Sequence, residues 1–333
     1  MSVEPRRPTL IDVARLAQVA PSTASRALKE SPRISEATRL RVAAAARGLG
    51  YQPNRVAQSL RAKTAPFIGI VVPDIGITFY SRFVKGAQEV LEAAGYQALV
   101  MSTEREAGHE EVALRTLEGH QVTGILLATS RPMAAESHIP TVYFDSLADG
   151  RGLARIALAN DQGMELLVGH LAGHGHTRIA YIGGPPMFTS GEERLAGFRA
   201  AAERHGVRLH AAYVEIADSS WSSDSAAAAM ARLLALAEPP TAVVASGDTL
   251  AMGAIAACRA AGRRVPDDVA LVAFDDPVFG ALVDPPVTAL RRSDYELGRE
   301  AAQLLLDGLR GEVATPSIRL PVDLVVRRSC GCP

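Results

Sequence analysis

Residues 9–28 place the strongest constraint on how this 333-residue chain can fold. Thr9 precedes a stretch in which apolar residues recur at helical spacing, and Asp12 lies three residues after Thr9. At this spacing the two side chains can cap the start of a helix. Pro21 suits the first position of a second helix, because no amide donor is needed there. Only a brief turn fits between the two helices. The sequence therefore predicts short helices that begin near Leu10 and at Pro21.

Apolar residues recur at helical spacing in both segments, so each predicted helix has a face that can pack inward. The inward residues expected in the first helix are Ile11, Val13, Ala14 and Ala17. Those expected in the second helix are Ala24, Ala27 and Leu28. The side chains left on its outer face are Ser22, Thr23, Ser25 and Arg26. This outer face is rich in groups that can form hydrogen bonds.

A third helix is expected after Ser35, which can cap its start, with Glu36 in the first turn. The apolar face expected for this helix consists of Leu40, Val42, Ala43 and Ala46. Gly48 and Gly50 are typical of a helix end. The three helices together predict a compact headpiece with a helix-turn-helix.

Charge is distributed unevenly along the chain. Residues 1–66 contain twelve Lys and Arg and four Asp and Glu, a formal balance of +8, whereas the rest of the chain stands at −9. The whole-chain charge of −1 conceals this asymmetry. Because neutralised phosphates supply much of the affinity for DNA, the basic segment favours a polyanionic partner. The alternative is a solvated basic face on an ordinary helical cap.

Motifs further along the chain complete a pattern. Gly-Tyr-x-Pro-Asn occupies residues 50–54, and Phe-Asp-Asp occupies residues 274–276. With these motifs the chain resembles the lactose/galactose repressor (LacI/GalR) family of bacterial transcription regulators over nearly its whole length. The resembling segments, in the family's order, are residues 9–28, 49–63, 67–74, 178–185, 193–198, 265–269 and 274–276. No single segment is specific, but the ordered set is.

The resemblance implies that the second helix lies in the major groove of double-stranded operator DNA. The specificity positions would be occupied by Pro21, Ser22 and Arg26, and phosphate contacts would come from Thr23 and Ser25. Thr9 is also expected to be a DNA-binding residue. Pro21 has no side-chain donor, so base reading should depend on Ser22 and Arg26. The family usually has Ser where this chain has Ala20, and loss of that cap could cost about 1 kcal/mol.

The segment from 54 to 65 is expected to be a hinge. Its helical part is too short to be stable alone in water, so it should fold only against DNA or a partner subunit. Val56, Ala57 and Leu60 give it one apolar face. The resemblance implies that the two hinge helices of a dimer pack together, that Leu60 enters the minor groove as a wedge, and that Asn54 contacts the DNA backbone nearby. Asn54, Val56, Ala57 and Leu60 are therefore expected among the DNA-binding residues. A plain linker is the alternative interpretation.

From residue 66 onward, short apolar runs alternate with Ala-rich stretches long enough for crossover helices. The runs expected to be buried parallel strands are residues 67–73, 98–101, 124–128, 141–144, 178–183, 241–245 and 269–274. This alternation predicts a doubly wound α/β core. The resemblance adds two lobes like those of periplasmic binding proteins. The expected domains are a headpiece at 8–53, the hinge at 54–65, the two-lobed core at 66–329 and a tail at 330–333.

Ligands of such folds bind beyond the carboxyl ends of the strands, and the resemblance puts a small-molecule effector between the lobes. The residues expected in that site are Phe79, Tyr80, Asp145, Phe188, Ser190, Arg194, Trp221 and Asp275. By resemblance, Arg194 and Asp275 hydrogen-bond the effector and Trp221 stacks on it, which suits a sugar. Each also has a structural interpretation: a turn cap for Asp275, a salt bridge for Arg194 and core packing for the aromatic residues.

Two departures bear on the effector. Many sugar-responsive members have an Ala-Asn-Asp triplet where this chain has Ser246-Gly247-Asp248. The purine-responsive branch also lacks that Asn, so a nucleobase effector stays open. Phe188, however, occupies the position at which a purine reader would have Arg. A sugar or a sugar derivative is the favoured effector.

An enzyme is the weaker alternative, because neither a Gly-x-Gly-x-x-Gly motif after a strand nor a phosphate-binding loop is present. No cofactor and no metal are expected. His174 and His176 have no obvious third ligand. Cys258, Cys330 and Cys332 form no disulfide framework, and the last two lie too close together in an exposed tail for a usual zinc pair.

Location and assembly follow from what the sequence lacks. The first eight residues do not resemble a signal peptide, and no apolar run is long enough to span a bilayer. A cytoplasmic protein, associated with the nucleoid when bound to its operator, is therefore expected. No Leu heptad follows the core, which favours a homodimer over a tetramer.

Overall fold

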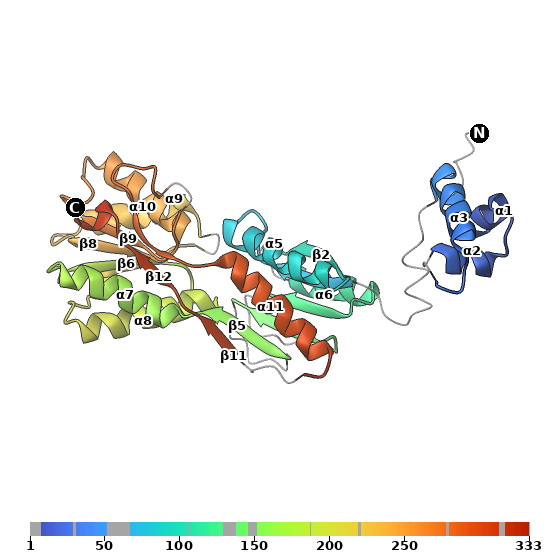
Figure 1. The fold of residues 1–333 in the computed structure, drawn as a ribbon. Coiled ribbons are helices and arrows are strands. Elements are labelled where there is room, and N and C mark those ends of the chain that lie inside the picture. Colours follow the sequence, from blue (N-terminus) through green and yellow to red (C-terminus); the bar gives the residue numbers. More distant parts are fainter. Residues whose placement is uncertain are drawn as a thin grey trace. The chain divides into compact units, whose positions relative to one another are not determined.

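The computed structural model describes residues 8–28, 31–51, 67–104, 106, 108–128, 138–145, 152–186, 188–218, 221–277, 280–312 and 317–332. The chain forms two compact units, residues 1–65 and 66–333 (Figure 1). The whole of the predicted hinge, residues 54–65, lies outside the described residues, and with it Asn54, Val56, Ala57 and Leu60. Among the residues that are described, no helix is long and apolar enough to cross a membrane.

The headpiece contains the three predicted helices, α1 (Leu10–Leu16), α2 (Pro21–Leu28) and α3 (Glu36–Gly48). At the start of α1, the amide of Thr9 donates to Asp12 Oδ2 at 2.8 Å, and the amide of Asp12 donates back to Thr9 Oγ1 at 3.4 Å. Ser35 Oγ accepts from the amide of Thr38 at the start of α3. The predicted caps of α1 and α3 are therefore confirmed.

Small residues fill the headpiece core, which consists of Val13, Ala14, Ala17, Ala24, Ala27, Val42, Ala45 and Ala46. Two predicted core residues are wrong, since Ile11 is 58% exposed and Leu40 is 62% exposed. Each residue of an α-helix turns about 100° from the last, so Ile11 lies to one side of the stripe that Val13 and Ala14 form. Leu40, two residues before Val42, lies on the far side of α3 for the same reason.

The turn between α1 and α2 contains a non-glycine residue in the left-handed region, Gln18, at φ +52°. This conformation costs an L-residue about 1–2 kcal/mol. We expect Gln18→Gly to stabilise the headpiece by about 0.5–1 kcal/mol, because relief of this strain exceeds the extra chain entropy of glycine. Hydrogen exchange of the α1 and α2 amides in the full chain measures the change. Gln121→Gly, at φ +53° in the other unit, is the matched control; faster headpiece exchange in Gln18→Gly would contradict the prediction.

Two six-stranded sheets form the second unit. The first has the order β11-β5-β4-β3-β1-β2 and the second β12-β10-β9-β8-β6-β7. The strands of the first sheet are β1 (Phe67–Val72), β2 (Gln97–Ser102), β3 (Gly124–Leu127), β4 (Thr141–Phe144), β5 (Ala154–Leu158) and β11 (Ser317–Leu320). Those of the second are β6 (Ile179–Gly183), β7 (Val214–Ile216), β8 (Ala242–Ala245), β9 (Ala270–Ala273), β10 (Thr288–Arg291) and β12 (Asp323–Val325).

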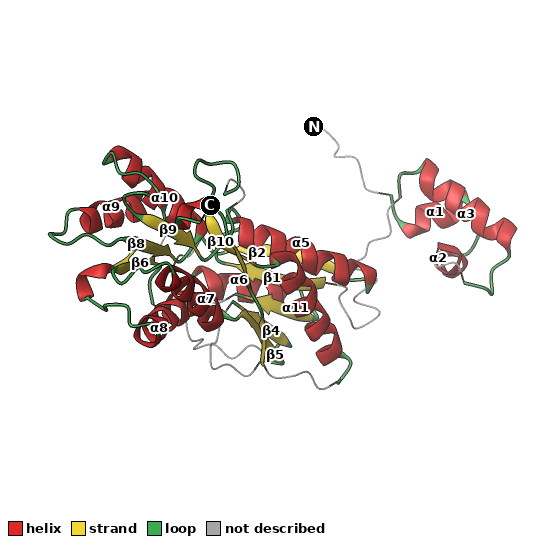
Figure 2. Ribbon diagram, turned by 60° about the vertical axis from the view of Figure 1, so that its left-hand side comes forward, coloured by secondary structure: helices red, strands yellow, loops and turns green. Residues whose placement is uncertain are grey.

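Helices cover both faces of each sheet (Figures 1 and 2). The helices beside the first sheet are α5 (Thr78–Ala93), α6 (His109–Gly119) and α11 (Asp294–Leu309). Those beside the second are α7 (Asn160–Gly173), α8 (Thr189–Arg204), α9 (Ser223–Leu234) and α10 (Asp248–Ala260), with single 3₁₀ turns η1 (Ala211–Tyr213) and η2 (Arg328–Cys330). Each sheet thus has an apolar core on both faces, formed in the first by α5 and α11 on one side and α6 on the other.

All seven predicted strands are present, and the predicted doubly wound α/β architecture is confirmed. One pairing departs from the parallel expectation, because β12 runs antiparallel to β10. The reason is that the short connection from β11 to β12 brings the chain back from the first sheet to the edge of the second.

The chain passes between the two sheets three times, after β5, after β10 and after β11. We call the first sheet with α5, α6 and α11 the first lobe, and the second sheet with α7 to α10 the second lobe. Because all three connections join the lobes, a site between them is built from chain segments that are far apart in the sequence.

The cysteines near the end of the chain do not lie in an exposed tail as predicted. Cys330 is 1% exposed and belongs to the apolar core of the second lobe, against which Cys332 also packs. Strand β12 and the turn η2 hold this segment on the second sheet. The expectation from sequence was wrong because neither element was predicted.

Candidate effector pocket

A pocket of about 740 Å³ lies between the lobes, at the ends of strands from both sheets. Its first-lobe wall contains Phe79, Tyr80 and Asp145, and its second-lobe wall contains Phe188, Ser190, Arg194, Trp221 and Asp275. The structure thus brings all eight predicted effector residues to one cavity. The polar lining residues that were not predicted as effector contacts include Asp74, Arg82, Asp248, Asp276, Arg291, Arg292, Asp294 and Arg327.

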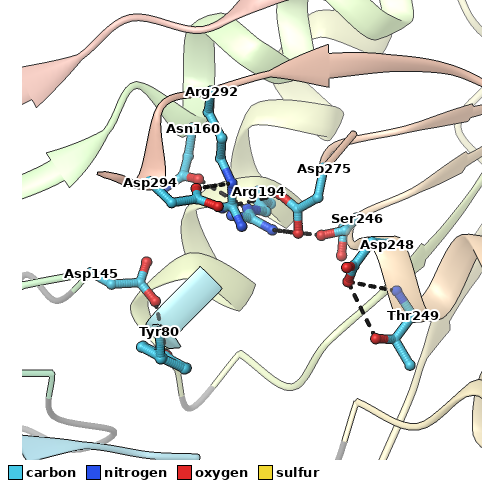
Figure 3. Close-up of polar contacts among 10 residues, drawn as sticks. All are labelled: Tyr80, Asp145, Asn160, Arg194, Ser246, Asp248, Thr249, Asp275, Arg292 and Asp294. Atoms are coloured by element: carbon cyan, nitrogen blue, oxygen red, sulfur yellow. Dashed lines mark hydrogen bonds and ion pairs between the residues drawn. The ribbon is translucent and has the colours of Figure 1, made fainter. Parts of the chain in front are cut away.

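Tyr80 and Asp145 lie in the first-lobe wall and are hydrogen-bonded to each other. Tyr80 lies in the first turn of α5, just after β1, and its hydroxyl donates to Asp145 Oδ2 at 3.2 Å (Figure 3). Asp145 directly follows β4 and has φ +49°, a left-handed conformation that is uncommon outside glycine. Strained backbone that persists at a pocket wall is typical of functional positions.

Burial raises the pKa of Asp145 to about 6, although Arg194, Arg292 and the Tyr80 hydroxyl each lower it. Asp145 therefore gains a proton in the folded chain at a pH where it would be ionised in the unfolded chain. A group with a raised folded-state pKa stabilises the fold at low pH and loses that contribution as the pH rises through the folded value.

We therefore expect the free energy of unfolding of the second unit to fall by about 2 kcal/mol between pH 4 and pH 7 on account of Asp145. Asp145→Asn should remove this part of the slope, since Asn is isosteric, does not titrate and tolerates the left-handed region. Tyr80→Phe should raise the pH at which Asp145 loses its proton in the folded chain, because the Tyr80 hydroxyl favours the ionised carboxylate. Denaturant unfolding at several pH values measures both. An unchanged slope in Asp145→Asn would refute the assignment.

Arg194 is fixed by the second lobe. It lies on α8 and is only 3% exposed. Its Nε donates to Asn160 Oδ1 at 2.9 Å, its Nη1 donates to the Ser246 carbonyl at 2.6 Å, and its guanidinium lies 3.8 Å from the centre of the Phe274 ring. The same Nη1 is 3.8 Å from Asp275 Oδ2. These contacts leave the cation rigid at the pocket wall.

Arg292 joins the lobes at the crossing from β10 to α11. Its Nη1 lies 3.0 Å from Asp275 Oδ1 in the second lobe, and its Nε lies 2.8 Å from Asp294 Oδ1 at the start of α11. Its guanidinium also covers the Phe79 ring at 4.4 Å. Figure 3 shows Arg292 and Arg194 together between Asp294 and Asp275.

Four carboxylates act on the charge of Arg292: those of Asp275 and Asp294, which are paired with it, and those of Asp145 and Asp248. Burial would lower the pKa of Arg292, but these four acids raise it. Burial also raises the pKa of Asp294 and of Asp248, and Arg292 opposes the rise in both. The pocket therefore contains many charged side chains, and its Asp and Arg residues are nearly equal in number. Such a lining suits a neutral ligand with many hydroxyl groups.

Two of these carboxylates have unused acceptor capacity. Within the described part of the chain, Oδ1 of Asp275 and Oδ1 of Asp294 are buried and accept no hydrogen bond of good geometry, although each lies in an ion pair with Arg292. Buried acceptors of this kind normally find a donor. A ligand hydroxyl in the pocket could supply one.

The indole of Trp221 closes the second-lobe wall. Trp221 has φ +54°, and its ring meets that of Phe188 edge to face, with centroids 6.4 Å apart. Gly184 makes room for it, because a Cβ at that position would lie 2.0 Å from Trp221 Cζ2. Phe188 and Ser190 are set by the start of α8. The pocket thus contains an aromatic platform as well as charged groups.

In the headpiece, the predicted DNA-binding side chains of α2 lie outward. Pro21, Ser22 and Arg26 are exposed, while Thr23 and Ser25 are half-buried. Thr9 is occupied by its cap, since its hydroxyl donates to Asp12 at 2.6 Å. Ala20 contributes only its carbonyl to the start of α2, where it accepts from the amides at 23 and 24.

Two family models match the chain: bacterial regulatory proteins of the lacI family over residues 9–54, and a periplasmic binding protein-like domain over residues 168–330. The transcriptional repressor CytR of Escherichia coli strain K12 is 32% identical over 338 residues, which cover 96% of each chain. The chain belongs to the lacI family of bacterial regulatory proteins. The regulator CelR of Thermobifida fusca is 35% identical and covers 97% of the chain, with 98% of CelR aligned.

Solved structures of family members agree with this assignment. The lac repressor dimer bound to operator and the anti-inducer ONPF superposes with a TM-score of 0.88 at 28% identity, covering 98% of this chain and 99% of that one. A complex of CelR with cellobiose superposes with a TM-score of 0.74 at 34% identity, covering 97% of this chain and all of CelR. Like these relatives, the lacI-family chain described here is a transcriptional regulator.

Proposed function

We propose that this regulator is a repressor that binds operator DNA as a homodimer in the cytoplasm and is controlled by a carbohydrate effector in the pocket between its lobes. The observation that carries the effector class is the pocket lining. The paired charged groups of Arg194, Arg292 and Asp275 line the same pocket as the indole of Trp221. Charged donors and acceptors with an aromatic platform match the hydroxyl groups and apolar faces of a sugar. The solved CelR relative carries cellobiose, a carbohydrate.

Control of DNA binding follows from the three crossings between the lobes. Arg292 lies on one crossing and contacts groups of both lobes, so an effector that alters its pairing changes the preferred lobe orientation. An effector that binds one orientation better shifts the population toward it. In a dimer, this shift would change the spacing of the two headpieces on adjacent half-sites.

The test has two stages. Selection from genomic fragments identifies the DNA that the full chain retains, and fluorescence anisotropy then measures binding with and without each member of a panel of mono- and disaccharides. We expect at least one sugar to change the affinity for the selected DNA about tenfold or more. Nucleobases and nucleosides form the second arm, and a response to these alone would replace the carbohydrate assignment. The effector is also recovered after incubation with the protein and identified chemically. Recovery without chemical change would show that the protein binds the effector and does not convert it.

Arg26 is the side chain of α2 best suited to read a base, since it is exposed and a guanidinium can pair with guanine. We expect Arg26→Ala to weaken binding to the selected site by about 1–3 kcal/mol and to relax its sequence preference. Arg15→Ala is the control, because Arg15 is exposed on α1 and pairs with Asp12. Equal losses in the two variants would contradict the role of α2.

A further inference from the structure

A cluster of histidine and cysteine side chains lies outside the effector pocket, where α7 meets the end of the chain. His170 and His174 are four residues apart and so share one face of α7. Cys332, which follows the turn η2, lies against this face. Its Sγ is 3.1 Å from His174 Nε2 and 3.7 Å from His170 Nε2. Two imidazoles that are 158 and 162 residues from the cysteine thus converge on one thiol.

Cys330 completes the set from the buried side. The ligand atoms of His170, Cys330 and Cys332 all lie within 4.8 Å of one another. In a tetrahedral zinc site, Zn–N bonds of about 2.0 Å and Zn–S bonds of about 2.3 Å put ligand atoms roughly 3.3–3.8 Å apart. The distances from Cys332 Sγ to the two histidines, 3.1 and 3.7 Å, lie close to this range. Side-chain movements that bring His174 and Cys330 toward the same point would close the tetrahedron.

The backbone holds the two thiols in place before any ion binds. Ser329 Oγ donates to the Leu271 carbonyl at 2.6 Å and accepts from the Thr288 amide at 2.8 Å, which fixes η2 on the second sheet. The Thr288 hydroxyl donates to Cys330 Sγ at 3.1 Å. Gly331 has φ +92°, a conformation that favours glycine and turns the chain so that Cys332 reaches α7. Supporting hydrogen bonds to the ligands are typical of metal sites.

We propose that His170, His174, Cys330 and Cys332 bind a thiophilic divalent transition-metal ion, with Zn²⁺ as the ion that best matches two imidazoles and two thiolates. Binding displaces one proton from each thiol, and the ion bonds to both sulfur atoms and to Nε2 of both histidines. Soft sulfur ligands select against Mg²⁺ and Ca²⁺. His174 is exposed and Cys332 is half-buried, which gives the ion a path in. The bound ion would cross-link the segment that carries Cys330 and Cys332 to α7.

Cobalt titration of the reduced full chain, freed of any polyhistidine tag, tests the proposal. We expect a thiolate-to-cobalt charge-transfer band and the intense visible bands of tetrahedral Co²⁺, which saturate at one ion per chain and disappear when Zn²⁺ is added. Cys332→Ser and His174→Ala should each weaken Zn²⁺ binding at least about tenfold in competition with a chelator. His174 is exposed, and Cys332→Ser changes one atom of a half-buried side chain, so both variants should fold.

His120→Ala is the matched control, because His120 is an exposed histidine at the end of α6, the position that His174 occupies on α7. It should retain the cobalt spectrum. Absence of the charge-transfer band in the wild-type chain, or its persistence at full intensity in Cys332→Ser, would overturn the proposal. A disulfide between Cys330 and Cys332 that forms again despite reductant and excludes the ion would overturn it as well.

Discussion

Replacement of Arg292 by Met is expected to destabilise the two-lobed unit by about 3–5 kcal/mol at neutral pH, because it leaves buried carboxylates without their cation. Asp275 and Asp294 lose the partner that pairs with both. Asp145 and Asp248 lose the positive charge that opposes the rise of their pKa values. Met keeps much of the volume of the Arg292 stem against Phe79, so the effect comes mainly from charge.

The pH dependence distinguishes this cause from a packing defect. Without Arg292, the pKa values of Asp294, Asp145 and Asp248 should rise further above their usual values in the folded state. Such groups stabilise the fold when protonated and lose that contribution as the pH rises. The cost of Arg292→Met should therefore be greater at pH 8 than at pH 5.

Denaturant unfolding at both pH values measures this difference, with Arg291→Met as the control. Arg291 is the preceding residue and is exposed, so its loss should change stability by less than about 0.5 kcal/mol. A cost for Arg292→Met that does not vary with pH would mean that lost packing, not unpaired charge, is responsible.

The strands that could be predicted from the sequence differ in one respect from those that could not. The seven strands that were predicted contain no charged residue within their observed bounds, and the only charge in a predicted run is Arg178, directly before β6. Each of the five missed strands carries one charged residue within three to five positions. These residues are Arg155, Glu215, Arg291, Arg319 and Asp323. A strand of three to five residues that contains one charge is not recognised as an apolar run, and it is too short for an alternation of apolar and polar residues to be detected.

The pocket shows a similar limit. Seven of its eight predicted residues follow strands or begin helices that the sequence indicated, so their convergence could be anticipated. Trp221 follows β7, which was not predicted, and its role was expected from the family resemblance alone. Arg292 was missed because it follows β10, a strand that was not predicted, and because its partners Asp275 and Asp294 belong to different lobes. The Arg-Arg-Ser-Asp run at 291–294, a basic pair before a helix cap, is the signal that could have revealed it.

The histidine and cysteine cluster could not be inferred from local spacing at all. His174 appeared to lack a third ligand because its nearest sulfur atom belongs to Cys332, at the other end of the second lobe's sequence. Only the return of the chain through β11 and β12 brings the two together.

Replacement of Gly184 by Ala is expected to weaken effector binding about 100-fold, or about 3 kcal/mol, if the effector stacks on Trp221 as proposed. A Cβ at residue 184 would lie 2.0 Å from Cζ2 and 2.1 Å from Cε2 of the indole. No contact of this length is tolerated, so the ring must leave its position beside Phe188. Gly184 itself has no side chain with which to bind a ligand, and the loss therefore reports the position of Trp221.

Trp221 is the single tryptophan of the chain, so intrinsic fluorescence reports its surroundings directly. The spectrum of Gly184→Ala should differ from that of the wild type even without ligand. Gly119→Ala is the control, because a Cβ there meets nothing within 4 Å. In Trp221→Ala, the added Gly184→Ala change should have little further effect on effector affinity, since the ring it displaces is already gone. Additive losses in the double variant would show that Gly184 acts on the pocket by another route.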